Sequence, residues 1–158
     1  MIRANRLPYK KCEKGNDFIE VTKSTDLTDL TKSTKLTKLN EYSPLVLAYL
    51  GDGVIEILAR EKLVKSGNIP PEQLHSKSLL FVKATAQSQA LENILPRLTE
   101  SETDIYKRGR NAKCRVPKSA SPADYRRATG MECLFGYLYL CGNETRIREL
   151  FEAAFGGG

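Results

Sequence analysis

The sequence predicts an all-α protein, and three observations lead to that prediction. No segment alternates apolar and polar residues with the period of two that a half-buried strand requires. Serine-proline pairs stand at 43–44 and 121–122, and this pair is typical of a helix N-terminus. Gly67 and Gly142 follow long apolar segments, where helices commonly end.

The composition predicts one domain with an N-terminal extension. The chain has 158 residues, close to the size of a single domain. Residues 1–38 are polar and mixed in charge, and they include most of a threonine- and leucine-rich repeat of nine residues that covers 24–32 and 33–41. Threonine in this number disfavours a helix. We therefore expect a weakly ordered extension at 1–38 and one folded domain at 39–158.

The helices of the domain are predicted from their start and stop signals. The first has a serine-proline start and is expected to be buried on all sides in its first half. Thr99 and Glu102 form a capping box. Residues 107–118 are expected to form a loop, because they contain glycine, asparagine and proline. The predicted helices cover residues 44–66, 72–83, 84–98, 100–107, 122–141 and 144–155.

Composition also limits the class of protein. The net charge of +6 indicates an anionic partner. No apolar run approaches the ~20 residues that span a bilayer, and the N-terminus lacks an apolar leader, so we expect no membrane partner and a cytoplasmic location. The single histidine, His75, makes a zinc site or a Ser-His-Asp triad hard to assemble. Hydrolytic chemistry would therefore depend on carboxylates.

Acidic residues in apolar helices are the candidate catalytic groups. Asp52 and Glu56 lie one turn apart in the first helix, and Glu132 lies in the helix at 122–141. A charged carboxylate on an apolar stripe is costly unless a cation, a metal or several donors compensate it. Gly51 and Gly136 would let another helix or a ligand come close. Two interpretations stay open: a divalent-metal site, with Mg²⁺ preferring such oxygen ligands, or a structural arrangement in which one acid of the first helix pairs with an arginine and the other faces solvent.

Basic residues are concentrated in the predicted loop. A solvated loop would have this composition, but arginine also makes bidentate contacts with phosphate, which favours nucleic-acid binding. Lys77, Lys83 and Gln87 are expected to form solvated helix surface, and His75 is expected to be structural. The candidate nucleic-acid-binding residues are Lys107, Arg108, Arg110, Lys113, Arg115 and Lys118.

Four motifs resemble a known family. Leu50-Gly51-Asp52 in an apolar helix resembles the ribonuclease III signature, and Glu132 in MECLFGYLYL resembles the second catalytic helix of that family. The closer similarity is to the short branch called Mini-ribonuclease III, whose motifs occur here in the same order and at similar spacing. It covers about 39–155 and is carried by LAYLGDGVIE, LHSKS, KRGRNAK and YRRATGMECLFGYLYL.

The resemblance implies a ribonuclease III-type helical endonuclease domain that acts as a homodimer on double-stranded RNA. Asp52 and Glu132 would be catalytic and would bind Mg²⁺. The short branch lacks the double-stranded-RNA-binding domain, so the basic loop would supply much of the RNA contact. The branch is associated with maturation of ribosomal RNA precursors (23S), and a ribosomal protein is a further candidate partner.

Two positions depart from the long enzymes of the family. Those enzymes have a glutamate where this chain has Ala48 and an aspartate where it has Thr129. The departures leave open how many metal ions bind and whether Glu56 or His75 assists the site. They also leave an alternative function, a non-catalytic RNA-binding or ribosome-associated protein with a ribonuclease III fold.

Overall fold

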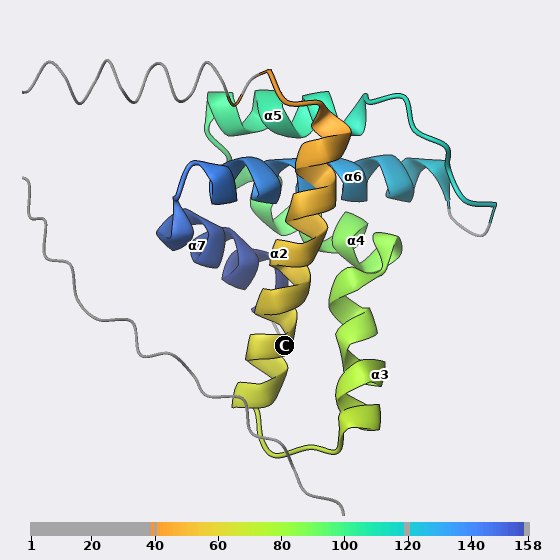
Figure 1. Ribbon diagram of the computed structural model, residues 1–158, viewed down its shortest axis with the longest axis vertical. Helices are drawn as coiled ribbons and strands as arrows, with labels where there is room; N and C mark the ends of the chain where they lie inside the picture. The colour runs from red at the N-terminus through yellow and green to blue at the C-terminus, as the bar shows by residue number, and fades with distance from the viewer. Residues whose placement is uncertain (1–38, 40, 119–120, 157–158) are drawn as a thin grey trace, which may run out of the picture.

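The computed structural model describes residues 39, 41–118 and 121–156, so the predicted extension at 1–38 lies outside the described part. Within that part the all-α prediction is confirmed, because every regular element is helical. The helices follow one another along the chain (Figure 1) as α2 (Pro44–Lys65), α3 (Pro71–Val82), α4 (Ala84–Ile94), the 3₁₀ turn η1 (Leu95–Arg97), α5 (Glu100–Arg110), α6 (Pro122–Leu140) and α7 (Glu144–Phe155).

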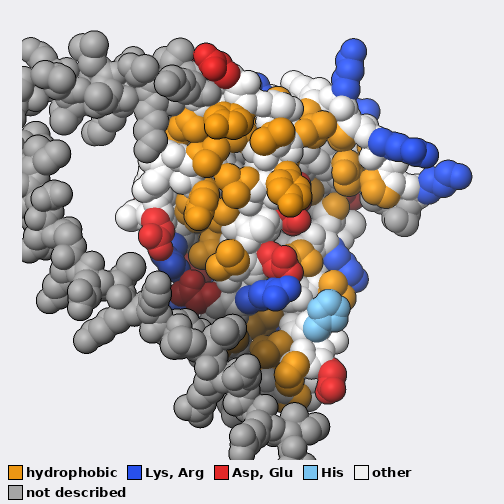
Figure 2. All heavy atoms as spheres, viewed as in Figure 1, with side chains coloured by type: hydrophobic (Ala, Val, Ile, Leu, Met, Phe, Trp, Pro, Cys, Tyr) orange, Lys and Arg blue, Asp and Glu red, His pale blue; other side chains and the backbone are white. Residues whose placement is uncertain are grey.

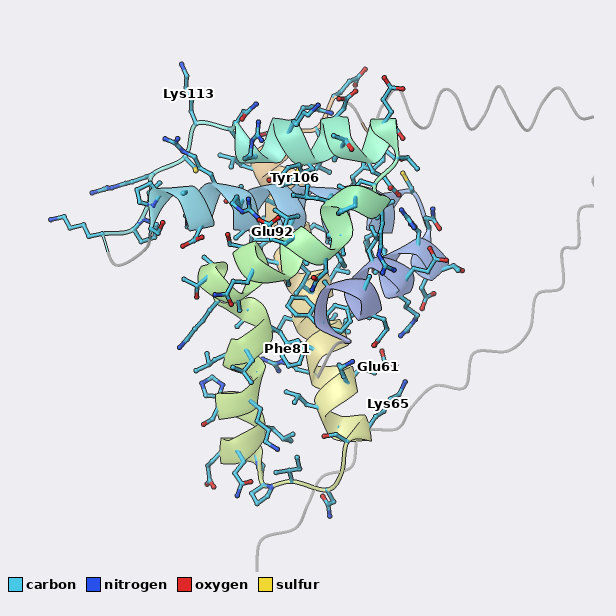
Figure 3. The ribbon with its side chains drawn as sticks, turned by 180° about the vertical axis from the view of Figure 1, so that it is seen from behind. Glu61, Lys65, Phe81, Glu92, Tyr106 and Lys113 are labelled. Carbon is cyan, nitrogen blue, oxygen red and sulfur yellow. The ribbon has the colours of Figure 1, made fainter. Side chains whose placement is uncertain are left out.

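Helix α6 is the centre of the fold. It contacts α2, α4, α5 and α7, and Figure 1 shows α2 crossing it while α5 runs along it. The main core joins apolar side chains of α2, α4, α6 and α7, with Phe135 and Leu134 of α6 fully buried. Phe81 of α3 points into the assembly in Figure 3 and lies 5.2 Å, ring centre to ring centre, from Phe155. Burial of this apolar surface is the main stabilising contribution to the fold.

Most predicted helix boundaries are confirmed to within a few residues. Thr99 forms the predicted capping box: its hydroxyl accepts from the Glu102 amide at 3.2 Å, and its own amide donates to Glu102 Oε2 at 2.9 Å. The prediction of a loop from residue 107 is wrong for its first four residues, because α5 continues to Arg110. Gly109 lies against α6, where an added Cβ would be 2.4 Å from Cys133 Cβ. The glycine thus serves helix packing instead of a turn.

The prediction that the first half of α2 is buried on all sides is also wrong. Leu47 is fully buried against α6, whereas Tyr49 is 86% exposed and Val46 is 53% exposed. The space-filling view of this side shows apolar side chains gathered where α2 passes over the molecule (Figure 2). Apolar residues surround this half of the helix, but only one of its sides meets α6, so the other side forms an exposed apolar surface.

Candidate active site

Two glycines bring α2 and α6 into close contact. A Cβ atom on Gly51 would lie 1.8 Å from the Glu132 carbonyl oxygen, and one on Gly136 would lie 2.0 Å from the Leu47 carbonyl oxygen. Any larger residue would therefore overlap the backbone of the opposite helix. Because Asp52 follows Gly51, this crossing places the first predicted catalytic acid on the same side of the molecule as the second, Glu132.

The two acids influence each other electrostatically. Burial, and then the charge of Asp52, raise the pKa of Glu132 from 4.5 to about 7. Burial, and then the charge of Glu56, raise the pKa of Asp52. Within the described part of the chain neither Asp52 nor Glu132 forms an ion pair, although both approach the crossing. The structural interpretation therefore holds for α2, where Glu56 pairs with Arg60 and Asp52 is exposed, but it does not account for Glu132 of α6, which is half-buried.

A divalent cation fits this pair of carboxylates. Mg²⁺ is commonly bound by one or two carboxylates, with waters and substrate phosphates completing its coordination. A cation would offset the repulsion that raises the pKa of Glu132. Among the described residues no three histidine, cysteine or acidic side chains gather into a metal-binding group, so an all-protein ligand cage of that kind is absent there. The arrangement matches a cation bound by two carboxylates and otherwise by water and RNA.

The sequence also raised Glu56, His75, Ala48 and Thr129 in connection with the site, and each has its own surroundings in the structure. Glu56 pairs with Arg60 at 2.5 Å on the surface of α2, so the ion-pair interpretation is confirmed for this acid. His75 lines a separate hollow with Arg60, between α2 and α3. Ala48 is buried, and the Thr129 hydroxyl donates to the Tyr125 carbonyl at 2.9 Å. Ala48 and Thr129 add no carboxylate to the site, and Glu56, whose charge raises the pKa of Asp52, is paired with Arg60.

Gln87 is the residue that the sequence prediction misplaced. It was expected on solvated helix surface, but its side chain is fully buried in α4. Its carboxamide lies near Glu132 and favours the charged carboxylate, which opposes the upward shift of that pKa. The helical periodicity of the sequence could have predicted this burial, because Gln87, Leu91 and Ile94 lie on one side of the helix.

The predicted RNA-binding residues separate into three groups. Lys107 pairs with Asp104 at 4.0 Å, and Arg108 donates to the Tyr42 carbonyl at 3.3 Å, toward the segment before α2. Arg110 instead lies over the Tyr106 ring at 5.7 Å, at the end of α5. The remaining three are exposed in the segment after α5, and they are Lys113, Arg115 and Lys118.

A basic hollow lies between the end of α5 and the start of α6. It measures about 670 Å³ and includes Arg110 and Lys113 with Arg126 and Arg127 of α6. Figure 2 shows basic side chains projecting at this end of the molecule, and Figure 3 shows Lys113 pointing away from the body. Burial, and then the charges of Cys114 and Glu132, raise the pKa of Tyr125, which lies near the start of α6.

The helical arrangement and the two acids at the crossing of α2 and α6 define a ribonuclease III-type nuclease domain. The sequence matches the Ribonuclease III domain over residues 45–143. It is 49% identical to "Mini-ribonuclease 3" of Symbiobacterium thermophilum, over 70% of this chain and 86% of that protein. It is 45% identical to "Mini-ribonuclease 3" of Brevibacillus brevis, over 73% of this chain and 87% of that protein.

A solved structure agrees with these sequence matches. The crystal structure of a Fusobacterium nucleatum protein is 31% identical, with a TM-score of 0.68, and covers 74% of this chain and 94% of the other. The chain therefore belongs to the Mini-ribonuclease 3 branch of the ribonuclease III family and is an endoribonuclease. Members of the family act on double-stranded RNA, often as dimers, and generally depend on a divalent metal. No described helix is long and apolar enough to cross a membrane.

Proposed function

We propose that this endoribonuclease hydrolyses phosphodiester bonds of double-stranded RNA with the help of Mg²⁺, in the maturation of 23S ribosomal RNA precursors. The observation that supports the reaction is the pair formed by Asp52 and Glu132, which repel each other at the crossing of α2 and α6 without a basic partner among the described side chains. The resemblance to Mini-ribonuclease III supports the choice of RNA. We also propose a cytoplasmic location and a ribosomal protein as a further partner.

Asp52 and Glu132 would hold the cation through their carboxylate oxygens. A bound Mg²⁺ supplies a Lewis acid that lowers the pKa of a coordinated water and stabilises negative charge on the phosphate. Burial and the neighbouring Asp52 keep the pKa of Glu132 at about 7, so the proton on Glu132 competes with the cation. The proposed reaction therefore requires Glu132 in its charged form.

The basic hollow would contact the phosphates of the duplex. Double-stranded RNA is recognised mainly through its shape, its phosphates and its 2′-hydroxyls. Arg110 and Lys113 are well placed for this role because they share the hollow with Arg126 and Arg127. Lys107, Arg108, Arg115 and Lys118 remain proposed contacts from the neighbouring surface. Each phosphate contact that is made increases the dependence of affinity on salt.

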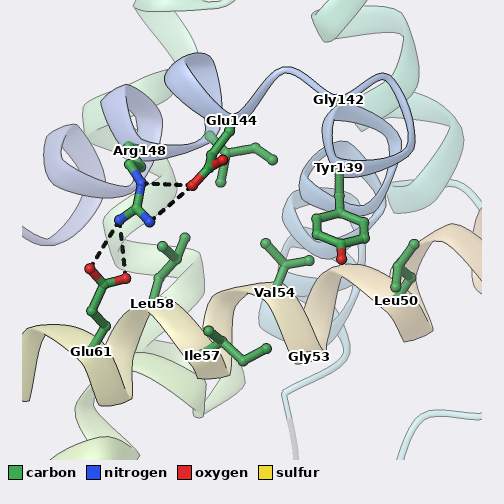
Figure 4. A pocket seen from close by; sticks show the side chains of 11 residues that line it. Leu50, Gly53, Val54, Ile57, Leu58, Glu61, Tyr139, Gly142, Glu144 and Arg148 are labelled. Carbon is green, nitrogen blue, oxygen red and sulfur yellow. Dashed lines mark hydrogen bonds and ion pairs between the residues drawn. The ribbon is translucent and has the colours of Figure 1, made fainter. Parts of the chain in front are cut away.

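The exposed apolar face of α2 would join two copies of the chain. Tyr49 is 86% exposed, Val46 53% and Tyr139 of α6 56%. Beside them lies an apolar hollow of about 410 Å³ (Figure 4), lined by Leu50, Gly53, Val54, Ile57, Leu58, Glu61, Tyr139, Gly142, Glu144, Ile147 and Arg148. A large exposed apolar surface commonly marks an interface. A two-fold dimer through this face would present two active sites to the two RNA strands.

The experiment that tests the proposed reaction compares isosteric variants in a duplex-RNA cleavage assay with and without Mg²⁺. Asp52→Asn and Glu132→Gln are expected to abolish Mg²⁺-dependent cleavage and to leave helicity and RNA binding nearly unchanged. Glu56→Gln is the matched control on α2, because its acid is paired with Arg60, and it is expected to cleave normally. Full activity of either Asp52→Asn or Glu132→Gln would refute the proposal.

A further inference from the structure

Gln87 has an environment that packing alone does not explain. Its side chain is fully buried in α4, yet neither Nε2 nor Oε1 completes a hydrogen bond of standard geometry with the described residues. A buried amide without partners destabilises a core, whereas an apolar side chain of similar volume would not. In native proteins such groups commonly belong to functional sites or to sites that hold water or ions.

The position of Gln87 relative to α6 is held by the residue that follows it. Arg127 of α6 donates through Nε to the Ser88 hydroxyl at 2.9 Å and through a terminal nitrogen to the Ser88 carbonyl at 3.0 Å. Arg127 also pairs with Glu92, which Figure 3 shows on α4 beside α6. These contacts link α4 to α6 through polar groups, so the part of α4 that carries Gln87 is held against α6.

The carboxamide lies next to the Glu132 carboxylate. The Gln87 amide approaches the Glu132 carboxylate from α4 as a donor, although no hydrogen bond of standard geometry is complete between them. Gln87 is thus a neutral donor beside a carboxylate that has no ion pair in the described structure. An amide can orient that carboxylate and leave its charge unchanged. A lysine or an arginine would neutralise the charge.

We propose that Gln87 is a positioning residue of the active site, whose Nε2 donates to one oxygen of Glu132 and leaves the other oxygen directed to the cation. This inference rests on the proposed function, in which Glu132 holds Mg²⁺. Partners that orient metal ligands typically change metal affinity by 10- to 100-fold when they are removed. The buried amide is retained for this orientation and not for the stability of the core.

The test replaces Gln87 with methionine, which has a similar length and no hydrogen-bonding amide. Calorimetric titration with Mn²⁺ in the absence of RNA is expected to show affinity lower by roughly 10-fold or more. The Mg²⁺ concentration for half-maximal cleavage is expected to rise by a similar factor. The thermal unfolding temperature in EDTA is expected to change little, because the variant loses the donor to Glu132 but also removes the cost of burying an amide. A residue with a merely structural role would move the unfolding temperature and leave metal affinity unchanged.

Two further variants make the result specific. Gln89→Met introduces the same chemical change on the exposed side of α4 and is expected to bind Mn²⁺ as the unaltered protein does. Gln87→Asn retains an amide and is expected to recover part of the affinity that Gln87→Met loses, which also guards against a folding defect. Unchanged Mn²⁺ affinity in both Gln87 variants would overturn the inference. If that occurred while Glu132→Gln abolished cleavage, the proposed function would stand without Gln87; cleavage by Glu132→Gln would overturn the proposed function itself.

Discussion

Replacement of Glu132 by glutamine is expected to stabilise the folded protein at neutral and alkaline pH. The pKa of Glu132 is raised from 4.5 to about 7, by burial and then by Asp52. The folded protein therefore keeps this proton to a higher pH than the unfolded chain does. Between these two pKa values the free energy of unfolding falls as pH rises, and above about pH 7 the full penalty is present. Glutamine has nearly the same shape and carries no charge, so the variant avoids the penalty.

The size of the effect follows from the shift in pKa. One pKa unit corresponds to about 1.4 kcal/mol, so the full shift corresponds to about 3 kcal/mol. Glu132 is half-buried, and screening by water reduces the expected gain to roughly 1–3 kcal/mol. Below about pH 4.5 the carboxyl is protonated in both states, and the variant and the unaltered protein should be equally stable.

Urea unfolding in EDTA at equal protein concentrations measures this difference. The free energy of unfolding would be compared between the variant and the unaltered protein at about pH 4.5, 6 and 8. EDTA is needed because a bound cation would offset the repulsion between Glu132 and Asp52. An equal stability at all three pH values, or a less stable variant at pH 8, would refute the reasoning.

Glu102 provides a control of opposite sign. Burial would raise the pKa of Glu102, but hydrogen bonds from Arg146 and Thr99 outweigh burial and keep that pKa below its usual value. The Arg146 Nε–Glu102 Oε1 distance is 2.9 Å. The contribution of the ionised Glu102 carboxylate to stability is therefore present above about pH 4.5, and it is lost as the pH falls through the pKa of Glu102 in the folded state. Glu102→Gln is expected to destabilise the protein by about 2–4 kcal/mol at neutral pH, and by less in acid.

Three further outcomes are expected. Gly51→Ala should lower the free energy of unfolding in urea by about 3 kcal/mol or more, because its Cβ would overlap α6. Gly53→Ala has open space around its Cβ and should raise the free energy of unfolding by up to about 1 kcal/mol. Equal effects of the two substitutions would contradict the close crossing. Tyr49→Glu should shift a dimer toward monomer in sedimentation analysis, and an unchanged mass would argue against the α2 face. Arg110→Glu combined with Lys113→Glu should weaken RNA binding and reduce its salt dependence by about two phosphate contacts, and an unchanged salt slope would exclude the basic hollow.

The helix boundaries were predictable because their signals are local. The Thr99 capping box and the proline after Ser121 fix helix starts through neighbouring atoms alone, and both occur in the structure as predicted. The adjacent glycines and the family motifs also predicted that Asp52 and Glu132 would lie close together, and the charge of Asp52 does act on Glu132; their catalytic role remains a prediction. Residues 1–38 were predicted to form a weakly ordered extension, and that remains a prediction.

The errors in prediction came from contacts between helices. Periodicity could not identify the buried side of α2, because apolar residues surround its first half and only the position of α6 decides which side is covered. Arg110 was assigned to a loop from its neighbouring glycine, but Gly109 is needed for contact with α6. Gln87 was placed at the surface because its side chain is polar, although its stripe is that of Leu91.

The long enzymes of the family have two further acids at the positions of Ala48 and Thr129, and the packing around Ala48 explains why this chain has no acid there. Ala48 is 5% exposed and lies in a small apolar cluster with Leu47, Ile105 and Cys133, where α2, α5 and α6 meet. A glutamate in place of Ala48 would have to fit several additional atoms and a charge into that cluster, which would separate the helices or leave the charge buried without a partner. The hydroxyl at Thr129 is directed to the backbone of its own helix. A glutamate at position 48 would therefore disturb the crossing that brings Asp52 and Glu132 together, and in the proposed reaction water and RNA phosphates would supply the remaining ligands of the cation.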